Sequence, residues 1–363
     1  MRERRTSITF LVPGRGTKPV GGFRVVYEYA NRLHAEGYHI SIVHLAWLYK
    51  TNPLLAGIGR YFYCLFFYPF HKQWLPLAKG IKNKWIFAPV APLIPDADYI
   101  VATSWETSEY VAAYPDSKGK KLYLIQADES EFTYVAQKGQ VQRALDTWRL
   151  PLHMIAICTW LKDRIQEMGS PSTVIFNGLN FKEFYVSTPP AERDPATVMM
   201  LYHFSPHKGC EEGIRALRLV KAQIPALKAT FYGIPPRPEG LEEWIEYYQT
   251  PSRETLRELY NRTAVFLSPS HSEGWGLPVS EAMQCGCAVV TTNIGGFKDF
   301  VSDNINGLCF NVSDIEGMAA SLQKLITDRD LRLAFAERGH SDIQQFTWEQ
   351  AVAKFIHLLK TID

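Results

Sequence analysis

Short apolar segments alternate with segments of helical periodicity along the chain, and this alternation constrains the fold more than any other feature. In the first half the apolar segments are SITFLV (7–12), HISIVHLA (39–46), ADYIVATSW (97–105), KLYLIQA (121–127), HMIAICT (153–159) and STVIF (172–176). Continuous apolar strands separated by helices are typical of parallel sheets whose two faces are both covered. The first half is therefore predicted to be a doubly wound α/β domain.

The pattern restarts after a stretch rich in proline and charge, residues 177–196, which suits a linker. The new apolar segments are TVMMLYHF (197–204), LKATFYG (227–233), AVFLSPS (264–270) and AVVTTN (288–293). A chain of 363 residues is also long enough for about two domains. We predict a first domain over 1–190 and a second over 191–345, both Rossmann-like.

Composition excludes several classes of protein. The net charge of +2 lacks the positive excess of a nucleic-acid binder, so no nucleic-acid partner is expected. The six cysteines are scattered apart from Cys285-Gly286-Cys287, which lacks metal-ligand spacing. The apolar run at 7–12 is too short for the core of a signal peptide. We therefore expect a cytoplasmic protein with reduced cysteines.

Ligands of open α/β sheets bind beyond the carboxyl ends of the strands, so the loops there are candidate sites. The loop 13–22 begins like a dinucleotide fingerprint with Gly14-Arg15-Gly16, but Pro19 stands where the third glycine belongs. The pair Gly21-Gly22 remains, at a helix start that suits a phosphate; a plain tight turn is the alternative. In the loop 202–214, Lys208 could face a diphosphate beside Gly209, or it could be an ordinary solvated lysine.

The stretch SHSEGWGLPVSEAMQCG, 270–286, sets two glutamates eight positions apart. Pro278 suits the first helical position, which leaves Glu273 on the turn and Glu281 in the first turn of the helix. Two hydrogen-bond acceptors that flank the free amides of Gly276 and Leu277 match a ligand with hydroxyls at both ends and a phosphate between them. A nucleotide sugar has this layout. In the alternative, Glu281 complements the helix dipole and Glu273 is solvated.

The string Glu273-Gly274-Trp275-Gly276-Leu277-Pro278, followed by Glu281-Ala282-Met283, resembles the E-x7-E signature of the retaining GT-B glycosyltransferases of family 4. Further similarities are Gly21-Gly22, Asn177-Gly178, Lys208-Gly209, Ser268-Pro269-Ser270, the segment 293–310 and the closing segment 346–360. The resemblance implies a GT-B fold, with an interdomain cleft, an acceptor-binding first domain and a donor-binding second domain. It also implies that a terminal helix, 346–363, packs back on the first domain.

The resemblance also implies residue roles. Glu273 would bind hydroxyls of the donor sugar, and Glu281 those of the ribose. The amides of Gly276 and Leu277 would hold the diphosphate together with Lys208 and the Gly21-Gly22 loop, and Gly209, Gly274 and Trp275 complete the donor set. Two positions depart from the family pattern: His203 replaces an arginine, and Gln126, Asp128 and Glu129 stand where members often carry a catalytic histidine. We therefore add Asp128 and Glu129 to Glu273 and Lys208 as catalytic candidates.

The implied reaction is sugar transfer with retention, in which the leaving diphosphate helps to deprotonate the acceptor hydroxyl. No metal and no cofactor beyond the nucleotide sugar is expected, because lysine and backbone amides supply the charge stabilisation. Two Asp-x-Asp matches, Asp96 to Asp98 and Asp328 to Asp330, lie before a strand and between helical segments, and we interpret them as structural. The alternatives are a non-catalytic nucleotide-sugar sensor or partner subunit, and a GT-B epimerase or phosphorylase, whose expected carboxylate or pyridoxal-lysine context is absent.

An aromatic stretch, 61–70, and the basic tip of Arg2, Arg4 and Arg5 suggest the acceptor. Such a stretch exposes more apolar surface than a small soluble sugar needs, whereas a lipid-linked glycan would cover it. The expectation is a peripheral enzyme at the inner membrane face that extends a surface polysaccharide or glycolipid. In the alternative, these aromatic residues belong to the core of the first domain.

Overall fold

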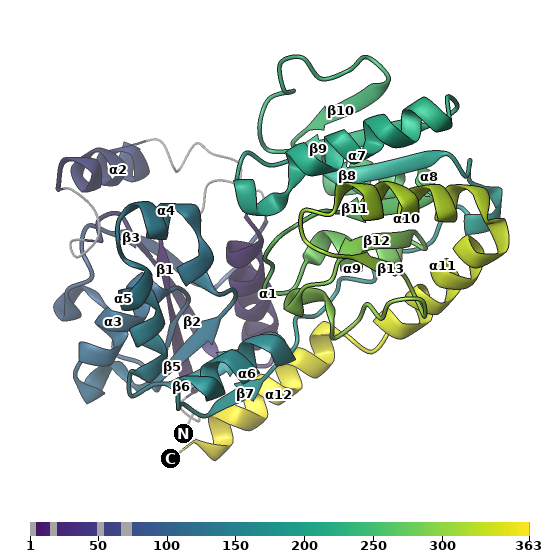
Figure 1. Cartoon of the computed structure of the whole chain (residues 1–363). Helices are drawn as coiled ribbons and strands as arrows, with labels where there is room; N and C mark the ends of the chain where they lie inside the picture. Colours follow the sequence, from purple (N-terminus) through teal and green to yellow (C-terminus); the bar gives the residue numbers. More distant parts are fainter. Residues whose placement is uncertain (1–4, 15–19, 49–53, 67–74, 363) are drawn as a thin grey trace. The chain divides into compact units, whose positions relative to one another are not determined.

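The computed structural model describes residues 5–14, 20–48, 54–66 and 75–362. The chain forms two compact units (Figure 1): Met1–Asn177 together with Glu349–Asp363, and Gly178–Trp348. Some residues on which predictions rest lie outside the described residues: Arg2, Arg4, residues 15–19 of the first loop and residues 67–70 of the aromatic stretch.

The first unit is built on a seven-stranded sheet in the order β3-β2-β1-β4-β5-β6-β7, and every pair in it is parallel. Its strands are β1 (Ser7–Pro13), β2 (His39–Leu45), β3 (Lys82–Ile86), β4 (Tyr99–Ala102), β5 (Lys120–Ile125), β6 (His153–Ala156) and β7 (Ser172–Val174). The sequence did not predict β3, because this edge strand reads KNKWI and is not a continuous apolar run.

The α-helices of the first unit are α1 (Gly21–Ala35), α2 (Leu54–Phe66), α3 (Trp105–Ala113), α4 (Thr133–Gln137), α5 (Val141–Asp146), α6 (Thr159–Glu167) and α12 (Trp348–Thr361). Its 3-10 turns are η2 (Ala91–Leu93), η3 (Asp116–Lys118), η4 (Glu129–Glu131) and η5 (Thr147–Arg149).

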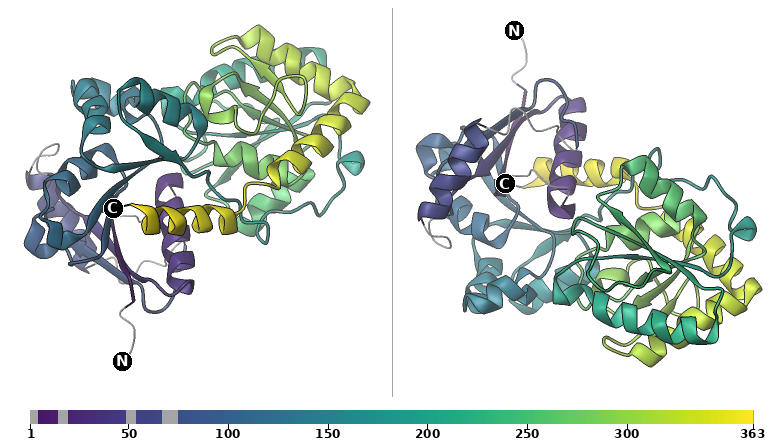
Figure 2. Two further views of the ribbon diagram at one scale, coloured as in Figure 1. Left: turned by 90° about the horizontal axis from the view of Figure 1, so that it is seen from below. Right: turned by 90° about the horizontal axis from the view of Figure 1, so that it is seen from above.

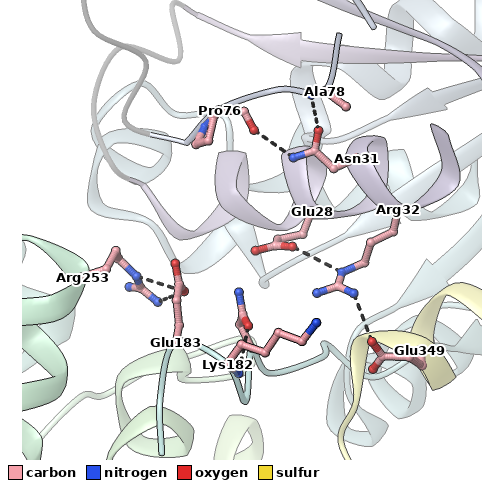
Figure 3. Close-up of polar contacts among 10 residues, drawn as sticks. Glu28, Asn31, Arg32, Pro76, Ala78, Lys182, Glu183, Arg253 and Glu349 are labelled. Carbon is pink, nitrogen blue, oxygen red and sulfur yellow. Dashed lines mark hydrogen bonds and ion pairs between the residues drawn. The ribbon is translucent and has the colours of Figure 1, made fainter. Parts of the chain in front are cut away.

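The terminal helix α12 packs beside α1 (Figure 2). The ring of Phe355 lies 5.0 Å from Tyr29 of α1 and 6.4 Å from Phe10 of β1, measured between centroids. Arg32 of α1 donates to Glu349 at the start of α12, 3.2 Å away (Figure 3). Chain segments from both ends of the sequence therefore share the core of this unit.

The second unit contains a six-stranded sheet in the order β10-β9-β8-β11-β12-β13, again parallel throughout. Its strands are β8 (Thr197–Leu201), β9 (Lys228–Gly233), β10 (Ile245–Gln249), β11 (Val265–Ser268), β12 (Ala288–Thr292) and β13 (Leu308–Phe310). Its helices are α7 (Cys210–Gln223), α8 (Arg253–Arg262), α9 (Leu277–Gln284), α10 (Ile315–Thr327) and α11 (Arg329–Ile343), with turns η6 (Pro190–Glu192), η7 (Pro206–Lys208) and η8 (Gly295–Phe297).

The second unit begins at Gly178, earlier than the boundary at 191 that the composition predicted. The intervening stretch is fixed by polar contacts to its own unit. Asn261 accepts from the amides of Ser187 and Thr188 at 2.7 and 3.1 Å, and the buried guanidinium of Arg193 donates to the carbonyl oxygens of Thr188 and Thr263. The prolines and charges of this stretch therefore belong to an ordered segment.

No helix among the described residues is long and apolar enough to cross a membrane. No disulfide joins Cys158, Cys210, Cys285, Cys287 or Cys309; the first four are buried and Cys309 is half-buried.

Candidate active site

The turn between β11 and α9 ends at a glycine that no other residue could replace without strain. Gly276 has φ of +81°, and a Cβ there would lie 2.3 Å from the ring of Phe297. Leu277 is the first helical residue and Pro278 the second, one position later than predicted. The amides of Gly276 and Leu277 have no acceptor within the described part of the chain, so the helix start offers two free donors.

Glu273 lies on this turn and is linked to Lys208. The Lys208 Nζ donates to Glu273 Oε1 at 2.7 Å, and Ser270 Oγ donates to the same oxygen at 2.8 Å. Gly209, with φ of +62°, closes the turn that carries the lysine, and a Cβ there would lie 2.1 Å from the carbonyl oxygen of Pro269. Close backbone packing therefore fixes where Lys208 sits.

These groups share one cavity of the second unit. It is lined by Leu201, Lys208, Phe266, Leu267, Ser268, Pro269, Ser270, Glu273, Gly276, Pro278 and Val279. Leu201 and Ser268 are the last residues of β8 and β11, so the cavity lies at the carboxyl edge of the sheet, where such folds bind ligands. A cation, a carboxylate and a helix start meet in it.

Glu281 is the fifth residue of α9 and so lies beyond the first turn, not within it as predicted. It is buried, with 4% of its surface exposed. Its Oε1 accepts from Arg253 at 3.2 Å and its Oε2 from the Tyr260 hydroxyl at 3.3 Å. The Tyr260 hydroxyl lies 2.8 Å from that of Tyr232. Because each carboxylate oxygen can accept a further hydrogen bond, Glu281 keeps acceptor capacity for a ligand.

Arg253 connects Glu281 to a second carboxylate. It donates to Glu183 Oε2 at 3.0 and 3.2 Å (Figure 3) and lies 4.2 Å from the centroid of the Phe184 ring. Burial alone would lower the pKa of Arg253, but Glu281 and Glu183 outweigh it and raise the pKa overall. No local sequence pattern predicts the pairing of Arg253, because its partners lie 70 and 28 positions away.

Histidines surround the lysine. His203 Nδ1 accepts from the Ser205 amide at 2.9 Å, and partial burial followed by the charge of Lys208 lowers the His203 pKa. The same two causes, burial first, lower the pKa of His207 to about 4. Both rings are therefore mostly neutral at pH 7, so His203 offers no fixed positive charge. His207 was not among the predicted site residues.

Trp275 was predicted to belong to the donor set, but its side chain lies in the core with 2% of its surface exposed. Its ring packs against Phe300 and Phe346 at centroid distances of 5.0 and 4.9 Å, and it does not line the cavity. A large aromatic ring stabilises the fold when it is buried, which explains why this side chain lies in the core. Trp275 therefore supports the turn from behind, and Gly274 beside it is likewise not among the lining residues.

In the first unit, Gly21 and Gly22 begin α1. A Cβ on Gly22 would lie 3.5 Å from the side-chain nitrogen of Gln126, which directly follows β5. Gln126 is partly exposed. Of the three residues that stand in place of the expected histidine, Gln126 is the one whose amide lies beside the Gly21-Gly22 helix start.

Asp128 and Glu129 have partners inside the first unit. Asp128 is fully buried; it accepts from the Ser130 amide at 3.1 Å and from Arg164 at 2.7 Å. Glu129 accepts from the Trp105 amide at 2.6 Å, and burial, followed by the charge of Glu106, raises its pKa to about 8. These contacts hold the loop after β5 in shape. They give Asp128 no exposed oxygen for a substrate.

The match to a family model lies within the second unit. Residues 182–342 match the family model described as glycosyl transferases group 1. The chain is 33% identical over 121 residues to the O-antigen chain mannosyltransferase B of Escherichia coli, an alignment that covers 33% of this chain and 31% of that protein. It is 26% identical over 270 residues to a D-inositol 3-phosphate glycosyltransferase of Salinispora arenicola, with 73% and 55% covered. The chain thus spans about a third to a half of these relatives.

Solved structures match the chain over nearly its whole length. Sucrose-phosphate synthase from Thermosynechococcus elongatus has a TM-score of 0.73 at 16% identity, with 98% of both chains covered. Anabaena HepE in complex with UDP-glucose has a TM-score of 0.74 at 17% identity, with 99% and 100% covered. The chain has the GT-B fold. The predicted α/β class with two Rossmann-like domains is thereby confirmed.

The GT-B fold distributes the predicted site residues between its two units. His203, Lys208, Gly209, Glu273, Gly276, Leu277 and Glu281 lie in the second unit, whereas Gly21, Gly22, Asp128 and Glu129 lie in the first. The family-model match contains the whole of the second-unit set. Lys208, Glu273 and Gly276 line one cavity. Gly276 caps helix α9, and Glu281 is a buried residue of the same helix.

Both Asp-x-Asp matches have structural contacts within the GT-B fold. Asp96 pairs with Lys118 at 2.7 Å, and Asp98 accepts from the amide and hydroxyl of Ser7 at 2.7 Å each. Asp328 caps α11 by accepting from the Leu331 amide at 3.0 Å. Over the described ranges, no group of three or more His, Cys, Asp or Glu residues could hold a metal ion.

Proposed function

We propose that this protein is a glycosyltransferase that moves a sugar from a nucleotide-sugar donor to a hydroxyl of an acceptor glycan. The observation that carries the proposal is the second-unit cavity, in which Lys208, Glu273 and the free amides at the start of α9 converge. The family-model match over 182–342 and the similar HepE structure, solved with UDP-glucose, support it.

Each group has a chemical role in this proposal. Lys208 and the amides of Gly276 and Leu277 bind the diphosphate, because a point cation and a helix start both favour an anion. Glu273, which now accepts from Lys208, also accepts from hydroxyls of the donor sugar. Glu281 accepts from the ribose hydroxyls while Arg253 holds its carboxylate in place.

We further propose a retaining mechanism, as in family 4, without a metal. The bond between the anomeric carbon and the diphosphate oxygen breaks, and the acceptor oxygen bonds to the same face of the sugar. The departing diphosphate receives the acceptor's hydroxyl proton, so the products are a glycoside and a nucleoside diphosphate. Lys208 and the two amides stabilise the charge that develops on the leaving group.

The acceptor that we propose is a lipid-linked glycan of surface polysaccharide or glycolipid synthesis, reached from the cytoplasmic face of the membrane. Helix α2, at the periphery of the first unit in Figure 1, packs on one side, where Gly57 abuts Trp47 and Tyr61 stacks edge-on against Phe87. Its other side exposes large apolar side chains at helical spacing: Leu54, Leu55, Ile58, Phe62 and Phe66. The helix is neither wholly core nor wholly surface, and this exposed stripe would bind the acyl or polyprenyl part of the acceptor.

The test is incubation of the protein with a panel of UDP-, GDP-, ADP- and dTDP-sugars and a lipid-linked acceptor, with and without EDTA. Release of nucleoside diphosphate, together with NMR of the new anomeric proton, reports transfer and stereochemistry. Retention of the donor's anomeric configuration and full activity in EDTA are expected. Inversion, or loss of activity in EDTA with rescue by manganese, would contradict the mechanism.

A non-catalytic nucleotide-sugar sensor is the second candidate. It is favoured by the neutral His203 and by Gln126 in place of a histidine. Calorimetric binding of a nucleotide sugar, without transfer to any acceptor in the panel, would support the sensor over the enzyme.

A further inference from the structure

The first unit contains a cavity at the edge of its sheet opposite to Gly22 and Gln126. Its volume is about 300 Å³, and Ser41, Lys82, Lys84 and residues 92–95 line it. Lys82 is the first residue of β3 and pairs with Ser41 of β2, while Lys84 pairs two positions further along. Because side chains alternate along a strand, Lys82 and Lys84 lie on the same face. Because Lys82 is the first residue of β3 and is paired with Ser41, the cavity lies toward the amino ends of β2 and β3.

Positive charge is concentrated around this cavity. Lys84 Nζ donates to the carbonyl oxygen of Leu93 at 2.8 Å, and Lys118 Nζ donates to that of Ile94 at 2.8 Å. Partial burial, followed by the charges of Lys82 and Lys118, lowers the pKa of Lys84. Three ammonium groups thus repel one another across a short segment of chain.

The chain supplies few counter-charges here. Asp96 is paired with Lys118 at 2.7 Å, and the sequence contains no aspartate or glutamate from 37 to 95. The ammonium of Lys82 and the hydroxyl of Ser41 have no partner among the residues that the structure describes. Two cations and one hydroxyl therefore line the cavity without a carboxylate to balance them.

We propose that this cavity binds a small phosphate monoester. A phosphate group carries nearly two negative charges and three acceptor oxygens, which match the ammonium groups of Lys82 and Lys84 and the hydroxyl of Ser41. The remaining wall, Pro92 to Pro95, includes the exposed side chain of Leu93 and faces the carbon skeleton of the ligand.

The volume of the cavity restricts the size of the phosphate monoester that it can bind. About 300 Å³ is at the lower end of small-molecule sites, so it suits a sugar phosphate or a glycerol phosphate. A nucleic acid or an acidic peptide would need an extended basic surface. Because the cavity is at the amino end of the sheet, its ligand is neither the donor nor the acceptor of the proposed reaction.

The test is calorimetric titration of the full chain with glucose 6-phosphate and glycerol 3-phosphate, with glucose and glycerol as neutral controls. Both phosphate monoesters should bind, and neither neutral compound should. Lys82→Gln should weaken binding about ten- to hundredfold, since a hydrogen bond to a charged group is lost, and Lys84→Gln should act likewise. Lys79→Gln, which removes an exposed charge just before β3 and outside the cavity, should leave the affinity unchanged.

Lys82→Gln is the decisive variant, because the Lys82 ammonium has no hydrogen-bond or ion-pair partner among the described residues whose loss could unfold the protein; thermal melting checks that the variant folds. Inorganic phosphate, titrated in parallel, shows whether the carbon skeleton adds affinity. Absence of binding tighter than about 1 mM for both esters would overturn the proposal. So would equal weakening in Lys79→Gln and Lys82→Gln, which would indicate a general charge effect. No donor is present, so either result leaves the proposed glycosyl transfer standing.

Discussion

Two regions of the molecule place acidic residues directly after a buried parallel strand, and they use those residues differently. After β5, Asp128 and Glu129 accept hydrogen bonds from Arg164, Ser130 and Trp105 and hold their own loop. After β11, Glu273 shares a cavity with Lys208 and a helix start whose amides are free. A carboxylate after the carboxyl end of a strand therefore indicates a ligand only where its surroundings leave hydrogen-bond donors free for one.

The largest expected effect comes from breaking the first region. Arg164→Ala leaves the fully buried Asp128 without its cation, and an uncompensated buried charge costs about 3 to 5 kcal/mol of unfolding free energy. Urea denaturation measures this loss. Nucleotide affinity should be unchanged under conditions where the variant is folded.

Arg149→Ala is the matched control for that experiment. Arg149 pairs with Asp146 at 3.0 Å, but both side chains are more than half exposed, and an exposed pair contributes only about 0 to 1 kcal/mol. If Arg164→Ala were as stable as Arg149→Ala and had lost nucleotide binding, Asp128 would belong to the ligand site and the contrast between the two regions would fail.

Lys208→Ala tests the second region. Removing the cation that stabilises the leaving diphosphate should lower kcat about 10²- to 10³-fold, as for other preorganised charge stabilisers, while stability changes by only about 1 kcal/mol. Steady-state kinetics and thermal melting measure the two effects. Lys324→Ala, an exposed lysine of α10, is the control and should behave as wild type. A turnover equal to that of the control would remove Lys208 from the mechanism.

Substitutions of Glu281 and Glu273, the two glutamates of the second region, should affect different measured quantities. Glu281→Ala should weaken free nucleoside diphosphate and donor alike, about ten- to hundredfold, whereas Glu273→Ala should spare the free nucleotide and lower turnover. Calorimetry with the nucleotide and kinetics with the donor distinguish them. Equal nucleotide affinity in wild type and both variants would contradict the assignment.

The sequence predicted the interior strands well because each is buried on both faces and so reads as a continuous apolar run. The edge strands β3 (KNKWI) and β10 (IEYYQ) were not predicted, because an edge strand is partly solvated and these two carry polar residues. The unit boundary was misplaced because composition cannot distinguish an exposed arginine from Arg193, which is buried against its own unit.

Candidate site residues could be proposed from the sequence where they are adjacent in it, as in the turn from Glu273 to Leu277, and their roles stay predictions. The Arg253–Glu281 pair spans 28 positions, and no local pattern encodes such a contact. For Trp275 and Asp128 the position in a motif or loop could be read from the sequence, but the burial of the side chain could not.

The smallest expected effect sharpens the comparison through pH. The pKa of Glu129 is raised to about 8 from 4.5, chiefly by burial, so between these values the folded protein keeps a proton that the unfolded chain releases. Stability from this group is thus fully present below about pH 4.5 and falls as the pH rises to about 8. Glu129→Gln does not titrate, so the variant should gain on wild type across this window, on the order of 1 kcal/mol per pH unit at most. Urea denaturation at pH 6 and pH 7 measures the difference, which is about 1 kcal/mol over this single unit, and a difference independent of pH would show that the Glu129 carboxylate is ionised in the folded protein.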